Sequence, residues 1–440
     1  MTIFKEYDVR GIYPSEINEK IFYEIGRAIK ILGVSVIAIG RDGRLSSDSL
    51  FEHLTRGLID SGVDVIDLGK VTSPILSFYC VKKKTFGAMI TASHNPKEYN
   101  GVKIIDKKGI QLSYNEGLNK IEKSIGKYDK NSHKGKLRKQ DFIGEYHKYI
   151  LKKFRGKFDR KLRVIFDCSN GVGFIALNVI ESLNIESFVI NKKMDGRFPN
   201  HSSDQTKKEN LAQLKREVKF RRADIGVMFD GDADRCAFVD EKGKIVPIDI
   251  AFLLMALAEI RRAKTKPLVL CDLRLSKIVN EEIKLAGGAT KTMRVGNPFY
   301  KKELHKNPKA ILAGEFSGHI MFKENYGIDD PLFASLKLIS IISNSENKFS
   351  EFISKYNKYY STGEISYIVA GKEKVFREVK NRYFRFGIKK MDGISVRTRD
   401  FWFNLRKSNT ENKIKLVIEG VDKNVVEENK KIIERIVRNG

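Results

Sequence analysis

Strand-like and helix-like segments alternate along roughly the first 340 residues, and this alternation constrains the fold more than any other feature. Buried-strand patterns such as VSVIAIGRD (34–42) and FGAMITAS (86–93) are separated by segments whose apolar residues recur at helical spacing, such as 46–62. Strands that alternate with helices in this way are typical of a largely parallel sheet covered by helices. We therefore expect an α/β fold over this part of the chain.

The alternation restarts twice, at KLRVIFDCSNGVG (161–173) and after GKIVPID (243–249), and it changes character near residue 361. Beyond that point several short strand patterns and one closing helix indicate an α+β domain. A chain of 440 residues is too long for a single hydrophobic core. The identity between the three α/β units is too low to establish a repeat from the sequence. We predict three α/β domains and a C-terminal α+β domain, with the ranges 1–150, 151–245, 246–358 and 359–440.

The N-terminal stretch MTIFKEYDVRG (1–11) has no apolar core, so it lacks the pattern of a secretory signal. No apolar run approaches the length of about eighteen residues that a membrane span requires. The four cysteines lack C-x-x-C spacing and lie beside apolar runs, which indicates buried thiols in a reducing compartment; they are Cys80, Cys168, Cys236 and Cys271. We expect a cytoplasmic protein with no membrane segment.

The net charge of +27 is large for a metabolic enzyme, and the excess is densest between Lys127 and Arg163. Such a charge fits nucleic acid, an anionic surface or small anionic substrates. It also fits a lysine-rich composition in which the charged side chains are solvated on the surface and have no binding role. No nucleic-acid-binding motif is recognisable, so we do not expect a nucleic-acid partner; steeply salt-dependent binding to DNA would favour one. The reason for the surplus is not apparent from the sequence.

The segment MFDGDADRCAF (228–238) contains three aspartates, Asp230, Asp232 and Asp234, two residues apart. In an extended chain this spacing places the three side chains on one side. Three carboxylates repel one another unless a cation holds them, and an oxygen-only ligand set favours Mg²⁺. An acidic turn is the alternative. An EF-hand is rejected because Arg235 stands where the turn glycine should be and the flanking segments are strand-like.

Two further loops carry polar groups at strand ends, where ligands bind in open α/β sheets. TASHNP (91–96) places Ser93 directly after the apolar run FGAMI. AGEFSGH (313–319) offers a carboxylate and a hydroxyl, a combination that suits vicinal sugar hydroxyls, although a plain turn explains it equally well. Its polar residues are Glu315, Ser317 and His319.

A fourth loop, LRKSNTEN (405–412), combines a guanidinium, two hydroxyls and a run of backbone N–H groups. That combination suits phosphate, although a basic turn would have the same composition. The residues concerned are Arg406, Ser408, Asn409 and Thr410. A serine that faces Mg²⁺ and phosphate-binding groups is able to carry a phosphoryl group itself.

Four motifs occur in one order along the chain: TASHNP (91–96), DGDADR (230–235), GEFSGH (314–319) and RKSNTEN (406–412). In this they resemble the α-D-phosphohexomutase family, and the resemblance covers nearly the whole chain. It implies a four-domain, heart-shaped enzyme with three similar α/β domains and a C-terminal domain of another type. The sugar loop and the N-terminal FKEYDVRGI are similar to the phosphomannomutase/phosphoglucomutase branch.

The resemblance implies a set of site residues. It implies Mg²⁺ held by phosphorylated Ser93 together with Asp230, Asp232 and Asp234. The catalytic residues that it implies are Ser93, His94, Lys103, Arg10 and Arg235. The substrate-binding residues that it implies are Glu315, Ser317, His319, Asn297, Arg274, Arg406, Ser408, Asn409 and Thr410.

The implied reaction interconverts hexose 1-phosphates and 6-phosphates of mannose or glucose, with glucose or mannose 1,6-bisphosphate as intermediate and activator. Amino-sugar mutases and a Mg²⁺-dependent phosphatase are the alternatives within related chemistry. The general base is open among His94, Lys103 and His319. The chain departs from the family at Asn297, where histidine is usual, and at Asn412, where proline is usual, and the first departure leaves the sugar preference open. We expect small hexose phosphates as partners and a monomer or homodimer.

Overall fold

The computed structural model describes residues 3–127, 133–408 and 413–439. The first domain contains a six-stranded sheet in the order β1-β5-β4-β2-β3-β6. β4, β2, β3 and β6 are parallel, whereas β5 is antiparallel to both β4 and β1. The strands are β1 (Val9–Ile12), β2 (Val36–Arg41), β3 (Asp64–Lys70), β4 (Phe86–Ile90), β5 (Tyr99–Ile105) and β6 (Leu137–Lys139). The helices are α1 (Glu19–Ala28), α2 (Ser47–Asp60), α3 (Ser73–Lys83) and α4 (Leu118–Ser124).

Both faces of this sheet are covered, because alternate residues of its central strands are apolar in both directions. Ile37 and Ile39 of β2 belong to one hydrophobic core together with Phe22 of α1 and Leu54 of α2. Ala38, between the two isoleucines, belongs to a second core that includes residues of α3. The continuous apolar runs in the sequence therefore correspond to strands buried on two sides.

The second and third domains have sheets in the orders β11-β10-β9-β7-β8 and β13-β12-β14-β15. The second consists of β7 (Leu162–Asp167), β8 (Ile185–Ile190), β9 (Ile225–Phe229), β10 (Cys236–Asp240) and β11 (Ile245–Val246), with α5 (Ile143–Phe154), α6 (Phe174–Leu177) and α7 (Ala212–Phe220). The third consists of β12 (Leu268–Asp272), β13 (Ala289–Met293), β14 (Ala310–Gly314) and β15 (Ile320–Phe322), with α8 (Ile248–Arg262), α9 (Lys277–Leu285), α10 (Asn297–Lys306), α11 (Pro331–Ser343) and α12 (Phe349–Tyr356). Helix α5 spans the predicted boundary at residue 150.

The three α/β domains share one strand topology. In each, a first core strand (β2, β7 or β12) lies between a second (β3, β8 or β13) and a third (β4, β9 or β14), parallel to both, and a fourth (β5, β10 or β15) lies antiparallel beside the third; in the first domain, β1 precedes these four. An aspartate at the carboxyl end of the first strand accepts the backbone N–H of the residue two positions later, at 2.9–3.0 Å, in all three: Asp42, Asp167 and Asp272. The repeat that sequence identity could not establish is therefore evident in the fold.

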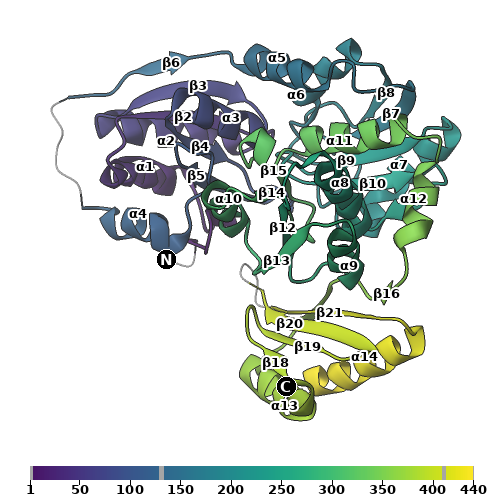
Figure 1. Cartoon of the computed structure of the whole chain (residues 1–440). Helices are drawn as coiled ribbons and strands as arrows, with labels where there is room; N and C mark the ends of the chain where they lie inside the picture. The colour runs from purple at the N-terminus through teal and green to yellow at the C-terminus, as the bar shows by residue number, and fades with distance from the viewer. Residues whose placement is uncertain (1–2, 128–132, 409–412, 440) are drawn as a thin grey trace.

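The C-terminal domain has an antiparallel sheet in the order β16-β21-β20-β19-β18, and β17 also pairs with β21. Its strands are β16 (Tyr360–Ser361), β17 (Ile365–Ile368), β18 (Ile388–Lys389), β19 (Ile394–Arg397), β20 (Phe401–Lys407) and β21 (Lys413–Gly420). Its helices are α13 (Lys372–Tyr383) and α14 (Lys423–Arg438). This domain projects below the body that the other three form, and its helices lie on the side of the sheet away from that body (Figure 1). The predicted α/β architecture with a different fourth domain is confirmed.

One expectation from the sequence holds with an addition, and another needs correction. The core strands of the three sheets are parallel, as expected, but β4, β9 and β14 each turn directly back into an antiparallel strand. The three aspartates do not lie on an extended chain: β9 ends at Phe229, and the backbone turns through Ala233, whose φ is +53°. Asp230 Oδ1 accepts the backbone N–H groups of Asp234 and Arg235 at 3.0 and 3.1 Å, which closes this turn.

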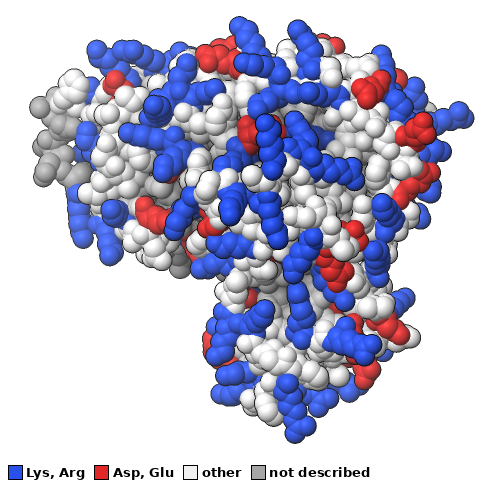
Figure 2. Space-filling model, in the orientation of Figure 1, with Lys and Arg blue, Asp and Glu red and all other residues white. Residues whose placement is uncertain are grey.

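The four cysteines are buried as free thiols, as the sequence predicted. Within the described residues, no helix combines the length and the apolar character that a membrane crossing requires. Lysine and arginine side chains are spread over the whole face shown in Figure 2, including the C-terminal domain, with acidic side chains between them. The positive charge is therefore not confined to the segment in which the sequence concentrates it most.

Candidate active site

Three loops at equivalent places in the three α/β domains meet one another. Each is the hairpin loop between the third and fourth strands: β4–β5, β9–β10 and β14–β15. Ser93 of the first loop donates to Asp230 of the second, and His319 of the third contacts the backbone oxygen of Asp234 at 3.0 Å. The fold therefore brings together three motifs whose contacting residues are 137 and 85 positions apart in the sequence.

Ser93 is fully buried and has a φ of +53°, a left-handed conformation that is strained for serine. Its Oγ donates to Asp230 Oδ2 at 2.8 Å and accepts a hydrogen bond from Arg235 Nη1 at 2.5 Å. Its backbone N–H donates to Thr91 Oγ1 at 2.8 Å. The hydroxyl thus lies between one carboxylate and one guanidinium.

Arg44 supports the Ser93 loop through hydrogen bonds to its backbone, and its side chain is fully buried. Its Nη2 donates to the carbonyl oxygens of Ser93 and Asn95, at 2.8 and 2.7 Å. Its Nη1 donates to the carbonyl oxygens of Pro96 and Tyr99, at 2.6 and 2.9 Å, and its Nε donates to Asp42. Four carbonyls that the loop turns inward are therefore satisfied by one side chain, which the sequence analysis did not assign to the site.

The carboxylates of Asp230, Asp232 and Asp234 are buried, and one oxygen from each lies within 4.8 Å of the others. Lys103 Nζ lies 2.6 Å from Asp232 Oδ2 and 2.7 Å from Asp234 Oδ2. Burial, together with the other two aspartates, raises the pKa of Asp230 to about 8. Burial opposes ionisation of Asp234 as well, but Lys103 and Arg235 hold its pKa well below the ordinary value.

This cluster fits a divalent cation. Asp232 Oδ1 and Asp234 Oδ1 are buried and accept no hydrogen bond from any of the described residues. Buried carboxylate oxygens normally have partners, so two orphaned oxygens in a set of three carboxylates indicate a ligand. An oxygen-only set is what Mg²⁺ prefers. Gly231 is required between the aspartates, because a Cβ there would lie 2.7 Å from the carbonyl oxygen of Ser93.

The β14–β15 loop, which the sequence predicted to bind the sugar, presents one carboxylate and one imidazole. Glu315 Oε1 accepts the backbone N–H of Gly296 at 3.0 Å, and burial raises the pKa of Glu315. His319 Nδ1 lies 3.1 Å from Asp329 Oδ2. Asp329 also accepts a hydrogen bond from Asn297 Nδ2, so this carboxylate joins two of the predicted substrate-binding residues. Ser317, also of this loop, is half-buried.

His94 and Arg10 contact residues that neighbour Ser93. His94 Nδ1 is 2.7 Å from Arg235 Nη1. Burial and the charges of Arg235 and Arg10 lower the pKa of His94 well below its ordinary value. Arg10 donates to Asn95 Oδ1 at 2.7 Å and pairs with Asp8 at 2.5 Å.

The predicted phosphate loop is attached to the third domain by one carboxylate. Glu364 Oε2 lies 2.8 Å from Arg274 Nη1 and 3.0 Å from Arg406 Nη2, and its Oε1 lies 2.9 Å from Lys415 Nζ. Burial opposes ionisation of Glu364, but these three cations hold its pKa low. Arg274 therefore links the third domain to the fourth through Glu364. Ser408, another predicted phosphate-binding residue, is the last residue of the described range 133–408.

Two of the predicted phosphate-binding residues, Asn409 and Thr410, lie outside the described residues. Three residues that contact the site were not predicted from the sequence: Arg44, Asp329 and Glu364. The segment GRDGRLSS (40–47), which places an arginine beside a turn, is the local signal that could have indicated Arg44. Asp329 and Glu364 have no such signal, because each acts through contacts with residues distant in the sequence.

Comparison with known proteins places this geometry in a family. Models of phosphoglucomutase/phosphomannomutase α/β/α domains I, II and III match residues 1–132, 144–243 and 249–359. The chain is 35% identical to a phosphomannomutase of Methanocaldococcus jannaschii over 99% of this chain and 98% of that protein. It is 36% identical to a phosphomannomutase/phosphoglucomutase of Pseudomonas syringae pv. tomato, over 93% of this chain and 89% of that protein.

A crystal structure of a phosphoglucomutase/phosphomannomutase family protein from Burkholderia thailandensis is also similar. Its TM-score is 0.89 at 27% identity, covering 100% of this chain and 97% of that one. The likeness thus extends through the C-terminal domain, beyond the three matched models. The chain belongs to the phosphoglucomutase/phosphomannomutase family.

Proposed function

We propose that this protein is a phosphohexomutase that interconverts the 1-phosphates and 6-phosphates of mannose or glucose, with Ser93 as the carrier of the transferred phosphoryl group. The observation that carries the proposal is the position of Ser93 Oγ, 2.8 Å from Asp230 and 2.5 Å from Arg235, at the edge of a buried aspartate cluster that fits Mg²⁺. The relatives are named phosphomannomutase and phosphomannomutase/phosphoglucomutase, and these names support a mutase reaction on mannose and glucose phosphates.

Phospho-Ser93 gives its phosphoryl group to O6 of a hexose 1-phosphate or to O1 of a hexose 6-phosphate. The bond from phosphorus to Oγ breaks, and a bond from phosphorus to the sugar oxygen forms. The sugar hydroxyl gives its proton to a general base, and Oγ takes up a proton to become the serine hydroxyl again. The product is a 1,6-bisphosphate, which turns over and returns its other phosphoryl group to Ser93. Glucose or mannose 1,6-bisphosphate would for this reason act as an activator.

Arg235 is placed to stabilise this transfer, because its Nη1 already contacts Oγ, the atom that gains negative charge as the bond breaks. Mg²⁺, when bound by Asp230, Asp232 and Asp234, supplies positive charge beside the phosphoryl oxygens. Lys103 balances the buried carboxylates at 2.6 and 2.7 Å.

His319 is the general base that the geometry favours. Its Nδ1 is engaged by the backbone oxygen of Asp234 and by Asp329, at 3.0 and 3.1 Å, so a neutral imidazole carries its proton there and Nε2 remains an acceptor. Lys103 is held between two carboxylates that raise its pKa. His94 Nδ1 is occupied by Arg235. His319→Ala should lower kcat by about 10²–10⁴-fold, and it should also slow phosphorylation of Ser93 by a bisphosphate, because that transfer is the same step in reverse and uses the same group as its general acid.

The remote phosphate is assigned to the C-terminal domain, through Arg406 and Ser408, with Asn409 and Thr410 assigned there from the sequence. Glu315 and Ser317 are assigned to the sugar hydroxyls. Asn297 donates a hydrogen bond to Asp329, and Asp329 also contacts His319. A different sugar that altered the contacts of Asn297 would therefore also affect the position of His319, the proposed base.

The test is conversion of mannose 1-phosphate and of glucose 1-phosphate, followed by ³¹P NMR in parallel with Mg²⁺ and a trace of glucose 1,6-bisphosphate. We expect 6-phosphates from at least one sugar, and none from Ser93→Ala. The matched control is Ser354→Ala, an exposed serine of α12 whose hydroxyl bonds only to a local carbonyl. Release of inorganic phosphate instead of isomerisation, or full turnover by Ser93→Ala, would overturn the proposal.

A further inference from the structure

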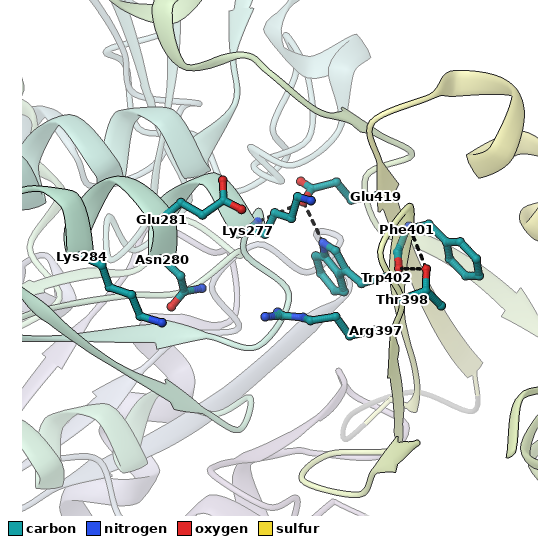
Figure 3. A pocket seen from close by; sticks show the side chains of 9 residues that line it. All are labelled: Lys277, Asn280, Glu281, Lys284, Arg397, Thr398, Phe401, Trp402 and Glu419. Atoms are coloured by element: carbon teal, nitrogen blue, oxygen red, sulfur yellow. Dashed lines mark hydrogen bonds between the residues drawn. The ribbon is translucent and has the colours of Figure 1, made fainter. Parts of the chain in front are cut away.

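A pocket lies between the third and fourth domains, and none of its lining residues belongs to the candidate active site described above. Its volume is about 310 Å³, at the lower end of the range typical of small-molecule sites. One wall is helix α9, and the other is formed by the β19–β20 hairpin and β21 (Figure 3). The lining residues are Lys277, Asn280, Glu281, Lys284, Arg397, Thr398, Phe401, Trp402 and Glu419.

Positive groups from both walls converge on this pocket. Figure 3 shows Lys284 and Asn280 of α9 pointing toward the guanidinium of Arg397, which reaches back from the opposite wall. Within the described part of the chain, neither Lys284 nor Arg397 makes an ion pair or a side-chain hydrogen bond. Two cations that face each other across a pocket repel, so an anion between them would remove that repulsion.

The acidic residues of the pocket are already engaged. Glu419 is buried, and its Oε1 accepts hydrogen bonds from Trp402 Nε1 at 2.7 Å and from the backbone N–H of Lys277 at 3.0 Å. Glu281 accepts a hydrogen bond from the hydroxyl of Tyr359 at 2.8 Å. Their partners are neutral donors, and neither carboxylate forms an ion pair with Lys284 or Arg397 within the described residues. The lining therefore has three cations, Lys277, Lys284 and Arg397, against two carboxylates, and keeps a positive excess.

We propose that this pocket binds a small phosphate-bearing anion. A guanidinium binds two phosphate oxygens with its fork, a lysine adds a point charge from the other side, and an amide such as that of Asn280 donates a further hydrogen bond. Lys277, whose Nζ lies 4.2 Å from the ring centroid of Tyr359, adds positive potential at the rim.

Such a ligand would act on the catalytic site through strand β20. Trp402 and Arg406 are four residues apart on β20, so their side chains lie on the same face of the sheet. Their register partners on β21 are Glu419 and Lys415. One end of this face lines the pocket and the other bears the cations that bind Glu364. An anion that ties α9 to this face would fix the phosphate-binding strand against the third domain.

Trp402 provides the test, because it is the only tryptophan of the chain and it lines the pocket. Its fluorescence should change saturably as pyrophosphate is added to the full-length protein at constant ionic strength and constant free Mg²⁺. Lys284→Ala and Arg397→Ala should each weaken the apparent affinity by about tenfold or more. Lys20→Ala, an exposed lysine of α1, is the matched control and should leave the titration unchanged.

The catalytic site also binds phosphate under the proposed function, so Arg406→Ala separates the two sites. The pocket is supported if Arg406→Ala retains the fluorescence response while both pocket variants weaken it. It is overturned if Arg406→Ala alone abolishes the response, if both pocket variants titrate like the parent, or if no saturable change occurs. Mutase activity of the two pocket variants, which lie outside the catalytic machinery, shows independently that they are folded.

Discussion

Replacement of Arg44 by lysine should damage both stability and catalysis, although the charge is kept. The guanidinium satisfies four loop carbonyls and Asp42 with its five N–H groups. A lysine has three donors on one nitrogen, so at least two of these five acceptors lose their partner. Each buried acceptor left without a donor costs about 1–3 kcal/mol, and part of the loop can turn to water. We expect a loss of about 2–4 kcal/mol in the free energy of unfolding.

The catalytic effect should appear in kcat rather than in KM. Arg44 is fully buried and cannot touch a substrate, but it fixes the carbonyl of Ser93, whose left-handed backbone needs that support. A small displacement of a reacting oxygen lowers the rate by up to about 10²-fold. Urea unfolding and steady-state kinetics with saturating Mg²⁺ measure the two effects on the same sample.

The matched control is Arg56→Lys on α2, an exposed arginine whose guanidinium lies 5.1 Å from the ring centroid of Tyr23. Its unfolding free energy should change by no more than about 0.5 kcal/mol, with kcat unaffected. If Arg44→Lys equals the parent in both stability and kcat, the carbonyl contacts do not hold the Ser93 loop and the reasoning is wrong.

Three further perturbations follow from the same contacts. Asp232→Asn should raise the Mg²⁺ concentration for half-maximal activity by about 10–100-fold, and an unchanged Mg²⁺ dependence would exclude this carboxylate as a ligand. Glu364→Gln removes the half-buried carboxylate that three cations share, so the Tm in a thermal-shift assay should fall by several degrees, and inorganic phosphate should raise the Tm of this variant more than that of the parent. Burial and the charge of Glu419 raise the pKa of Asp249 to about 8, so the folded parent keeps a proton that the unfolded chain has released above about pH 4. Parental stability therefore falls as pH rises toward 8, by up to about 1.4 kcal/mol per pH unit, and urea unfolding of Asp249→Asn should show an advantage over the parent that grows from pH 5 to pH 8; a constant difference would contradict this assignment.

Local patterns predicted the elements that are buried on two sides or strongly amphipathic. Strand β2 (Val36–Arg41), helix α2 (Ser47–Asp60) and strand β4 (Phe86–Ile90) lie within the segments 34–42, 46–62 and 86–93 that the sequence predicted for them. The direction of β5 was not predicted, because YNGVKII (99–105) has the same apolar character whichever way it pairs. Strand direction depends on where the chain returns, which is a property of the whole domain.

The candidate site divides in the same way. Ser93 and the three aspartates were found because each motif is contiguous in the sequence. The fold then brings Ser93 Oγ to 2.8 Å from Asp230 Oδ2. Glu364 was not found, because a single carboxylate in a strand-like segment has no local signal, and its importance arises only when three cations from two domains meet on it. The turn of the aspartate loop was also missed, since alternation of Asp with Gly and Ala fits a strand as well as a turn.

The central claim is that Ser93 carries the phosphoryl group. The most direct measurement is incubation of the full-length protein with Mg²⁺ and glucose 1,6-bisphosphate carrying ³²P in both phosphates, followed by peptide mapping of the label by mass spectrometry. The account predicts label on the peptide that contains Ser93, discharged on addition of hexose 1-phosphate to yield labelled bisphosphate, and no label in Ser93→Ala. Conversion of hexose phosphate by a protein that never acquires label at Ser93 would contradict it.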